Sequence, residues 1–115
     1  MADKYHQIAD DLRGSARELR SDIPDVIKGY AQLHAAATAE GVLSKKTKEL
    51  IALAISVVNK CDGCISSHAR AAAIQGASRD EVSEAIGVAI MLSGGPGTVY
   101  GPRALEAFLE YQETH

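Results

Sequence analysis

The chain of 115 residues has no tryptophan, one phenylalanine and only two cysteines, and its charge shows no strong excess of either sign. Its 12 Lys and Arg residues stand against 15 Asp and Glu residues, which gives a net charge of −3. A mildly acidic chain without a basic cluster argues against nucleic acid as a main partner. Two cysteines are also too few for a disulfide-dense secreted scaffold.

The sequence also lacks a long apolar run. The longest, residues 50–55, is far shorter than the ~20 residues that span a bilayer, and residues 1–7 are too polar for a secretory signal. We therefore expect a cytosolic protein with no membrane partner. Because the cytosol keeps thiols reduced, two close cysteines there indicate redox chemistry or metal binding rather than a structural disulfide.

Alanine is abundant, with 19 residues, and the period-two alternation of strands is not evident. These features predict an all-α fold, a single-domain bundle of about six helices over residues 1–115. Residues 1–20 are expected to form a peripheral N-terminal helix. The predicted helices cover residues 2–20, about 21–41, 45–59, 61–75, 78–92 and 98–112, with a break at the glycine-rich residues 93–97.

Capping residues predict where two of these helices start. Ser44 is a typical N-cap for the helix over residues 45–59, and Ser78 with Glu81 forms a capping-box pattern. The helix over 45–59 is apolar on nearly every side, which is typical of a central helix covered by its neighbours.

The segment from Cys61 to His68 carries the residues best suited to chemistry. Cys61 and Cys64 lie three positions apart at a helix start, where the partial positive charge of the helix end favours a thiolate. His68 follows Cys64 by four residues, so both lie on one helix face and the imidazole could take the thiol proton. The spacing favours Cys64 as the activated thiol and Cys61 as the resolving partner, although the reverse assignment also fits.

Glu49 is the third candidate, because it lies in the most apolar helix of the chain. A carboxylate that faces inward needs a partner, and the Cys/His face of the next helix could supply one. In that position Glu49 could relay protons. The simpler alternative is an ion pair with Lys45 or Lys46 on the same helix.

Taken together, the spacing of Glu49, Cys61, Cys64 and His68 resembles the signature of the AhpD-like alkylhydroperoxidases, within the carboxymuconolactone decarboxylase superfamily. The segments that flank the cysteines support the resemblance, which extends over roughly residues 23–109. These segments are residues 48–54, 71–78 and 81–86.

The resemblance implies an all-α subunit that assembles into a homotrimer or homohexamer and acts as a thiol peroxidase or in disulfide exchange. By the family pattern, Cys64 attacks the hydroperoxide substrate, Cys61 resolves it as a disulfide, and Glu49 and His68 relay protons. An external dithiol, lipoyl-type or thioredoxin-like, reduces the pair again. No bound cofactor is required.

The chain departs from the best-studied peroxidases of the family, which carry a further histidine between the two cysteines. This sequence has Asp62 and Gly63 there, and the charge of Asp62 would oppose thiolate formation. Superfamily members that decarboxylate a lactone generally lack the cysteine pair, so the pair argues against that reaction.

Several alternatives stay open from the sequence. One is a dithiol–disulfide oxidoreductase with weak peroxidase activity, and another is a non-catalytic assembly subunit whose cysteines are vestigial or merely packed. A third is a mixed zinc site formed by the two cysteines with His68 and Glu49. The other histidines have no partners at useful spacing and are expected to be solvated or packing residues; these are His6, His34 and His115.

Overall fold

The computed structural model describes residues 3–114, and within them it is built from α-helices without a strand, which confirms the all-α prediction. The helices are α1 (Lys4–Asp22), α2 (Pro24–Thr38), α3 (Lys45–Val58), α4 (Asp62–Ile74), α5 (Arg79–Ser93) and α6 (Gly95–Glu113). The predicted helix start at residue 2 and His115 lie outside the described residues. No helix within residues 3–114 is both long and apolar enough to cross a bilayer.

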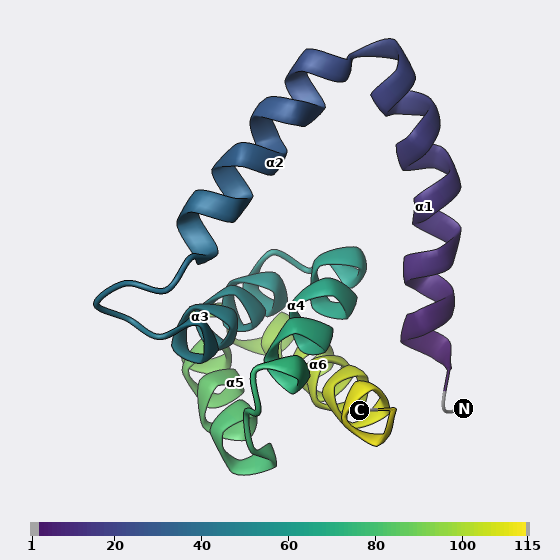
Figure 1. Cartoon of the computed structure of the whole chain (residues 1–115). Helices are drawn as coiled ribbons and strands as arrows, with labels where there is room; N and C mark the ends of the chain where they lie inside the picture. Colours follow the sequence, from purple (N-terminus) through teal and green to yellow (C-terminus); the bar gives the residue numbers. More distant parts are fainter. Residues whose placement is uncertain (1–2, 115) are drawn as a thin grey trace.

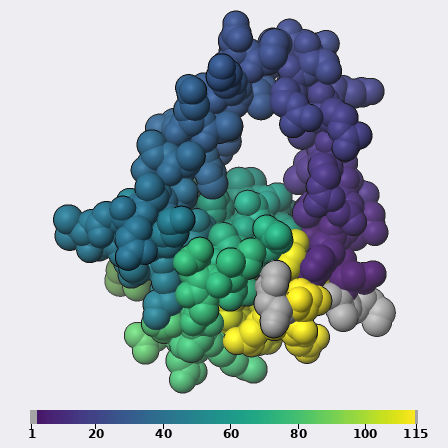
Figure 2. Space-filling view, in the orientation of Figure 1, coloured from purple at the N-terminus to yellow at the C-terminus, as the bar shows by residue number. Residues whose placement is uncertain are grey.

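Helices α3 to α6 pack against one another, whereas α1 and α2 extend from this bundle as two arms that meet at their far ends (Figure 1). An opening lies between the arms and the bundle (Figure 2). The core is formed mainly by small and branched aliphatic side chains with three aromatic residues. Its buried members are Tyr5, Leu53, Val57, Ile65, Ala69, Ala72, Ala77, Val82, Ile86, Ala89, Ala104, Ala107, Phe108 and Tyr111. Because so many are alanine, the helices can approach closely with few aromatic residues.

The predicted caps are present. The Ser44 hydroxyl accepts the backbone N–H of Thr47 at 3.1 Å, and Ser78 and Glu81 form the complete capping box at the start of α5. Each cap satisfies backbone donors that have no partner inside the helix. These contacts explain why the starts of α3 and α5 could be predicted from the sequence.

The glycine-rich break between the last two helices is much shorter than predicted. Gly94, with φ of 65°, makes the turn, and α6 begins at Gly95 rather than near Thr98. Pro96 suits the first helical turn, where its missing N–H is not needed. A Cβ on Gly101 would lie 2.9 Å from the Ile86 side chain, so the glycines of α6 permit its close packing on α5.

The N-terminal end of α1 is fixed to α6 by a buried carboxylate. Glu110 accepts the backbone N–H of Tyr5 at 3.0 Å and that of His6 at 2.7 Å, and it also accepts the ring Nδ1–H of His6. His6 therefore has a partner that the sequence spacing did not indicate. On the other side, the Ser66 hydroxyl donates to the Tyr5 carbonyl at 2.7 Å.

These bonds also set the ionisation of Glu110. Burial alone would raise the pKa of this carboxyl, but the N–H groups of Tyr5 and His6 and the His6 ring outweigh burial and lower its pKa below the ordinary 4.5. The ionised form therefore contributes stability above pH 4.5, and this contribution is lost as the pH falls through the lowered pKa.

We predict that Glu110→Gln lowers the free energy of unfolding at pH 7 by about 1–3 kcal/mol, because it removes charge-assisted hydrogen bonds. The difference from the wild type should shrink as the pH falls below 4.5. Urea unfolding at several pH values measures this, with Glu113→Gln on the exposed end of α6 as the matched control. Equal stability of the wild type and Glu110→Gln at pH 7 would contradict the prediction.

Candidate functional site

The two cysteines stand at the start of α4. Cys61 is the N-cap residue, and its sulfur accepts the backbone N–H of Cys64 at 3.2 Å. The two residues are joined by a disulfide, with their Cα atoms 5.2 Å apart, inside the usual range for this bond. Cys64 is an exposed residue and Cys61 is half-buried.

Glu49 and His68 meet between α3 and α4. The Nδ1–H of His68 donates to Oε1 of Glu49 at 2.7 Å. Glu49 is only 6% exposed, although it is an acidic residue in the second turn of α3. Lys46, considered above as a partner of Glu49, instead pairs with Glu81 of α5 at 3.0 Å. The structure therefore brings together the carboxylate and the imidazole that the sequence singled out.

This bond determines which ring nitrogen of His68 is available for chemistry. With Nδ1–H donated to the carboxylate of Glu49, Nε2 is the nitrogen that can accept a proton. Cys64 lies one helical turn before His68, on the same face of α4, a spacing that brings Cβ atoms within about 5–6 Å. The arrangement can hold a base near a thiol and orient that base from behind with a buried carboxylate.

His34 of α2 also reaches this site, and the sequence had not identified it. Its ring lies nearly parallel to that of His68, with ring centroids 6.0 Å apart and an angle of 19° between the planes. Tyr30 follows on the same side of α2, with its ring centroid 6.5 Å from that of His34. No local spacing signals a contact between residues 34 and 68, because it forms only when α2 folds back towards α4.

Asp62 and Gly63, which separate the cysteines, are both engaged elsewhere. Asp62 pairs with Arg103 of α6 at 3.4 Å, so its charge beside the sulfurs has a cationic partner. A Cβ on Gly63 would lie 2.7 Å from the Leu12 side chain, so α1 packs directly on the turn between the cysteines. A larger side chain at Gly63 would require Leu12 to move.

The zinc alternative finds no support in the arrangement of donors. Within residues 3–114, no group of three or more His, Cys, Asp or Glu side chains is placed to hold a metal ion. The two sulfurs are bonded to each other, and Glu49 is bonded to His68.

Comparisons with known proteins agree with this geometry. Residues 24–108 match the carboxymuconolactone decarboxylase family. A crystal structure of a carboxymuconolactone decarboxylase family protein from Legionella pneumophila superposes with a TM-score of 0.92 at 40% identity, over 96% of this chain and 98% of that one. An uncharacterized protein of Haemophilus influenzae is 44% identical over 97 residues, which are 84% of this chain and 86% of that protein.

A more local match connects the chain to a peroxide-reducing enzyme. The alkyl hydroperoxide reductase AhpD of Anaeromyxobacter sp. strain K is 45% identical over 49 residues, which are 43% of this chain and 26% of that protein. The family match covers most of the chain, and the Legionella structure shares its whole helical arrangement. The resemblance seen in the sequence is therefore confirmed, and the chain belongs to the AhpD-like, all-α carboxymuconolactone decarboxylase family.

Proposed function

We propose that the protein is a thiol-dependent peroxidase that reduces hydroperoxides through Cys61 and Cys64. The observation that carries this proposal is the hydrogen bond of His68 to the buried Glu49, one helical turn from an exposed cysteine that can pair with a second cysteine. The local similarity to an alkyl hydroperoxide reductase supports it.

The reaction begins with both cysteines reduced. The Cys64 thiolate attacks the terminal oxygen of the hydroperoxide, the O–O bond breaks, and the alkoxide leaves as an alcohol after taking a proton, so Cys64 becomes a sulfenic acid. The sulfur of the Cys61 thiol then attacks the Cys64 sulfur, the S–O bond breaks, and the leaving hydroxide takes the proton of the Cys61 thiol, so the products are the disulfide and water. A disulfide between Cys61 and Cys64 is the product expected from this second step, and these two residues are joined by such a bond.

In this proposal His68 accepts the thiol proton of Cys64 at Nε2 and returns it to the leaving alkoxide. Glu49 holds the imidazole in the required orientation and stabilises its charged form. The ring of His34 lies nearly parallel to that of His68, with the ring centroids 6.0 Å apart. In this proposal His68 is the single base that exchanges a proton with the Cys64 thiol.

An external dithiol, lipoyl-type or thioredoxin-like, completes the cycle. Its first thiolate attacks the sulfur of Cys64 and displaces the Cys61 thiolate, and its second thiol then closes the reductant's own disulfide and releases Cys64. The cycle needs a compartment that keeps thiols reduced, in keeping with the cytosolic location predicted from the sequence. No bound cofactor takes part in these steps.

One observation favours a second candidate, a dithiol–disulfide oxidoreductase with weak peroxidase activity. The space beside Gly63, between the two cysteines, is taken by Leu12 rather than by a second histidine. With a single histidine on the cysteine helix, proton transfer to the leaving alkoxide would be slower, while thiol–disulfide exchange would still proceed.

We expect reduced wild-type protein to lose both thiols when it reacts with one equivalent of cumene hydroperoxide, and Cys64→Ser to keep its remaining thiol. Serine is a good N-cap, so Cys61→Ser should retain the start of α4 and react at Cys64 without forming an internal disulfide. Thiol titration and mass spectrometry measure these outcomes.

Retention of both thiols by the wild type would overturn the peroxidase proposal. If that protein nevertheless exchanges its disulfide rapidly with dihydrolipoamide or reduced thioredoxin, the oxidoreductase alternative is correct. Equal oxidation of Cys61→Ser and Cys64→Ser would overturn the assignment of Cys64 as the attacking thiol.

We also propose that the subunit assembles into a homotrimer or homohexamer. Helix α2 has no buried residue, although Val26, Tyr30 and Leu33 form an apolar stripe along it at steps of four and three. Helices of this length depend on tertiary packing for their stability, and this one finds little within the subunit. A second apolar surface, between α3 and α5, is formed by Ile51, Ile55, Val58, Val88 and Leu92.

The assembly can be tested by size-exclusion chromatography with light scattering. We expect the wild type to have the mass of three or six subunits, and Leu33→Glu to dissociate it, because a charge would be buried at the interface. Val42→Glu, in the fully exposed loop before α3, is the matched control and should keep the wild-type mass. A monomeric wild type at micromolar concentration would contradict this proposal.

A further inference from the structure

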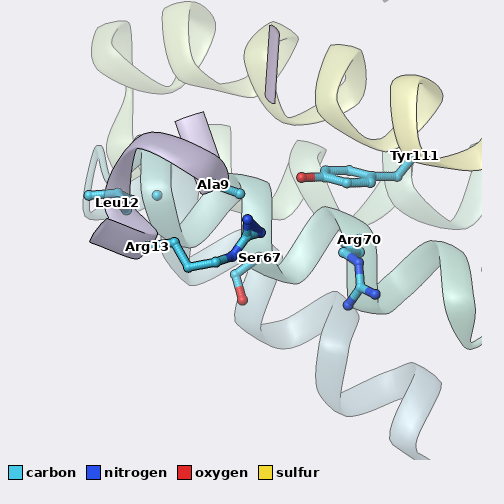
Figure 3. Close-up of a pocket in the computed structure, with 7 residues that line it drawn as sticks. Ala9, Leu12, Arg13, Ser67, Arg70 and Tyr111 are labelled. Atoms are coloured by element: carbon cyan, nitrogen blue, oxygen red, sulfur yellow. The ribbon is translucent and has the colours of Figure 1, made fainter. Parts of the chain in front are cut away.

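A cavity of about 450 Å³ lies between the arm α1 and the cysteine helix α4. Its volume falls in the range of small-molecule sites. Figure 3 shows that Leu12 and Arg70 lie towards opposite ends of the labelled residues, with Arg13 and Ser67 between them. The lining residues are Ala9, Leu12 and Arg13 of α1, Gly63, Ser67 and Arg70 of α4, and Tyr111 of α6.

The charge of this cavity is positive. Arg13 is paired with Asp10 one turn earlier in α1. Arg70 has no carboxylate within ion-pair distance among residues 3–114. Two guanidinium groups against one carboxylate leave about one positive charge, and guanidinium groups bind carboxylates through paired hydrogen bonds. The cavity therefore suits a ligand with one negative charge.

The remaining walls suit an apolar chain. Ala9 and Leu12 contribute methyl groups from α1, and Tyr111 contributes its ring. The Tyr111 hydroxyl is already bonded to the Ser66 hydroxyl at 2.8 Å, so the ring acts here as an apolar surface. A ligand with a charged head and an apolar body matches both parts of the lining.

The cavity leads from the arginines to the cysteine turn. Gly63, Ser67 and Arg70 follow one another at steps of four and three along one face of α4. The rise of an α-helix places Arg70 about 10 Å along the axis from Gly63. Gly63 lines the cavity and directly precedes Cys64 in the chain, so a ligand held at Arg70 can bring a group about 10 Å away to the turn that carries the two cysteines.

We propose that this cavity binds hydroperoxides that carry a carboxylate and an apolar chain, such as fatty acid hydroperoxides. The carboxylate lies between Arg70 and Arg13, the chain follows Ala9 and Leu12, and the hydroperoxyl group reaches the Gly63 end. This assignment of the substrate class rests on the peroxidase function proposed above. The chemistry at Cys64 is unchanged, and the cavity selects which hydroperoxide reaches it.

The kinetic test compares linoleic acid hydroperoxide with its methyl ester. We expect the wild type to prefer the acid in kcat/KM, and Arg70→Gln to lower the acid-to-ester ratio about tenfold through loss of a charged hydrogen bond. Arg79→Gln, an exposed arginine at the start of α5, is the matched control and should keep the wild-type ratio. Equal kcat/KM for acid and ester in the wild type would overturn the proposal.

A binding test keeps this inference separate from the peroxidase proposal. Titration calorimetry of the disulfide form should show that decanoate, kept below the concentration at which it forms micelles, binds at least about tenfold more tightly than decanol. Arg70→Gln should weaken the binding of decanoate and leave the binding of decanol unchanged. Equal affinity for the two ligands, or no effect of Arg70→Gln on decanoate, would overturn the cavity assignment. If decanoate binds as expected but cumene hydroperoxide leaves both thiols intact, the peroxidase function is wrong and the carboxylate site stands.

Discussion

The hydrogen bond between Glu49 and His68 is the contact on which the candidate site and the proposed reaction depend. A buried carboxylate without a partner is costly, so the position of Glu49 inside the bundle requires the imidazole of His68. The bond joins α3 to α4, selects the nitrogen of His68 that stays free, and holds this base on the face of α4 that carries Cys64. Without it, the cysteine pair would be two thiols at a helix start with no oriented base.

The start of α4 places the two cysteines in different environments. Because Cys61 is the N-cap and Cys64 is the third residue of the helix, their side chains converge at the helix start while only Cys64 is exposed. Asp62 between them is paired with Arg103, which reduces the repulsion expected from its charge. The same turn that brings the sulfurs together leaves room at Gly63 for Leu12, and so connects the reactive pair to the arm α1.

Much of the fold could be predicted because its signals are local. Serine caps and apolar periodicity lie within a few residues of the helices they define, and the four-residue step from Cys64 to His68 is a property of one helix. The contacts that were missed join residues far apart in the chain, such as His34 with His68 and His6 with Glu110. The predicted start of α6 is wrong for a different reason. A run of glycines usually indicates a break between helices, but the glycines of α6 lie inside the helix and permit its close packing on α5.

The arms α1 and α2 add contacts and surfaces that the bundle of α3 to α6 lacks by itself. Helix α1 is fixed at its first turn by Glu110 and forms one wall of the cavity beside the cysteines, while α2 brings His34 to His68 and exposes an apolar stripe. A core built largely from alanine packs closely but buries modest apolar area, which fits a subunit that gains further stability by association. Both arms therefore lie beside the candidate site, α1 at the turn between the cysteines and α2 near His68.

In the proposed reaction Glu49, through His68, promotes attack by Cys64. The most direct measurement is the rate at which dimedone-trapped sulfenic acid appears on Cys64 in the Cys61→Ser protein after addition of hydroperoxide, followed by mass spectrometry. We expect a slowing of about 100-fold when Glu49→Gln is added, within the range of acid–base catalysis, and no change when Glu84→Gln is added on the exposed face of α5. Equal rates with and without Glu49→Gln would contradict this expectation.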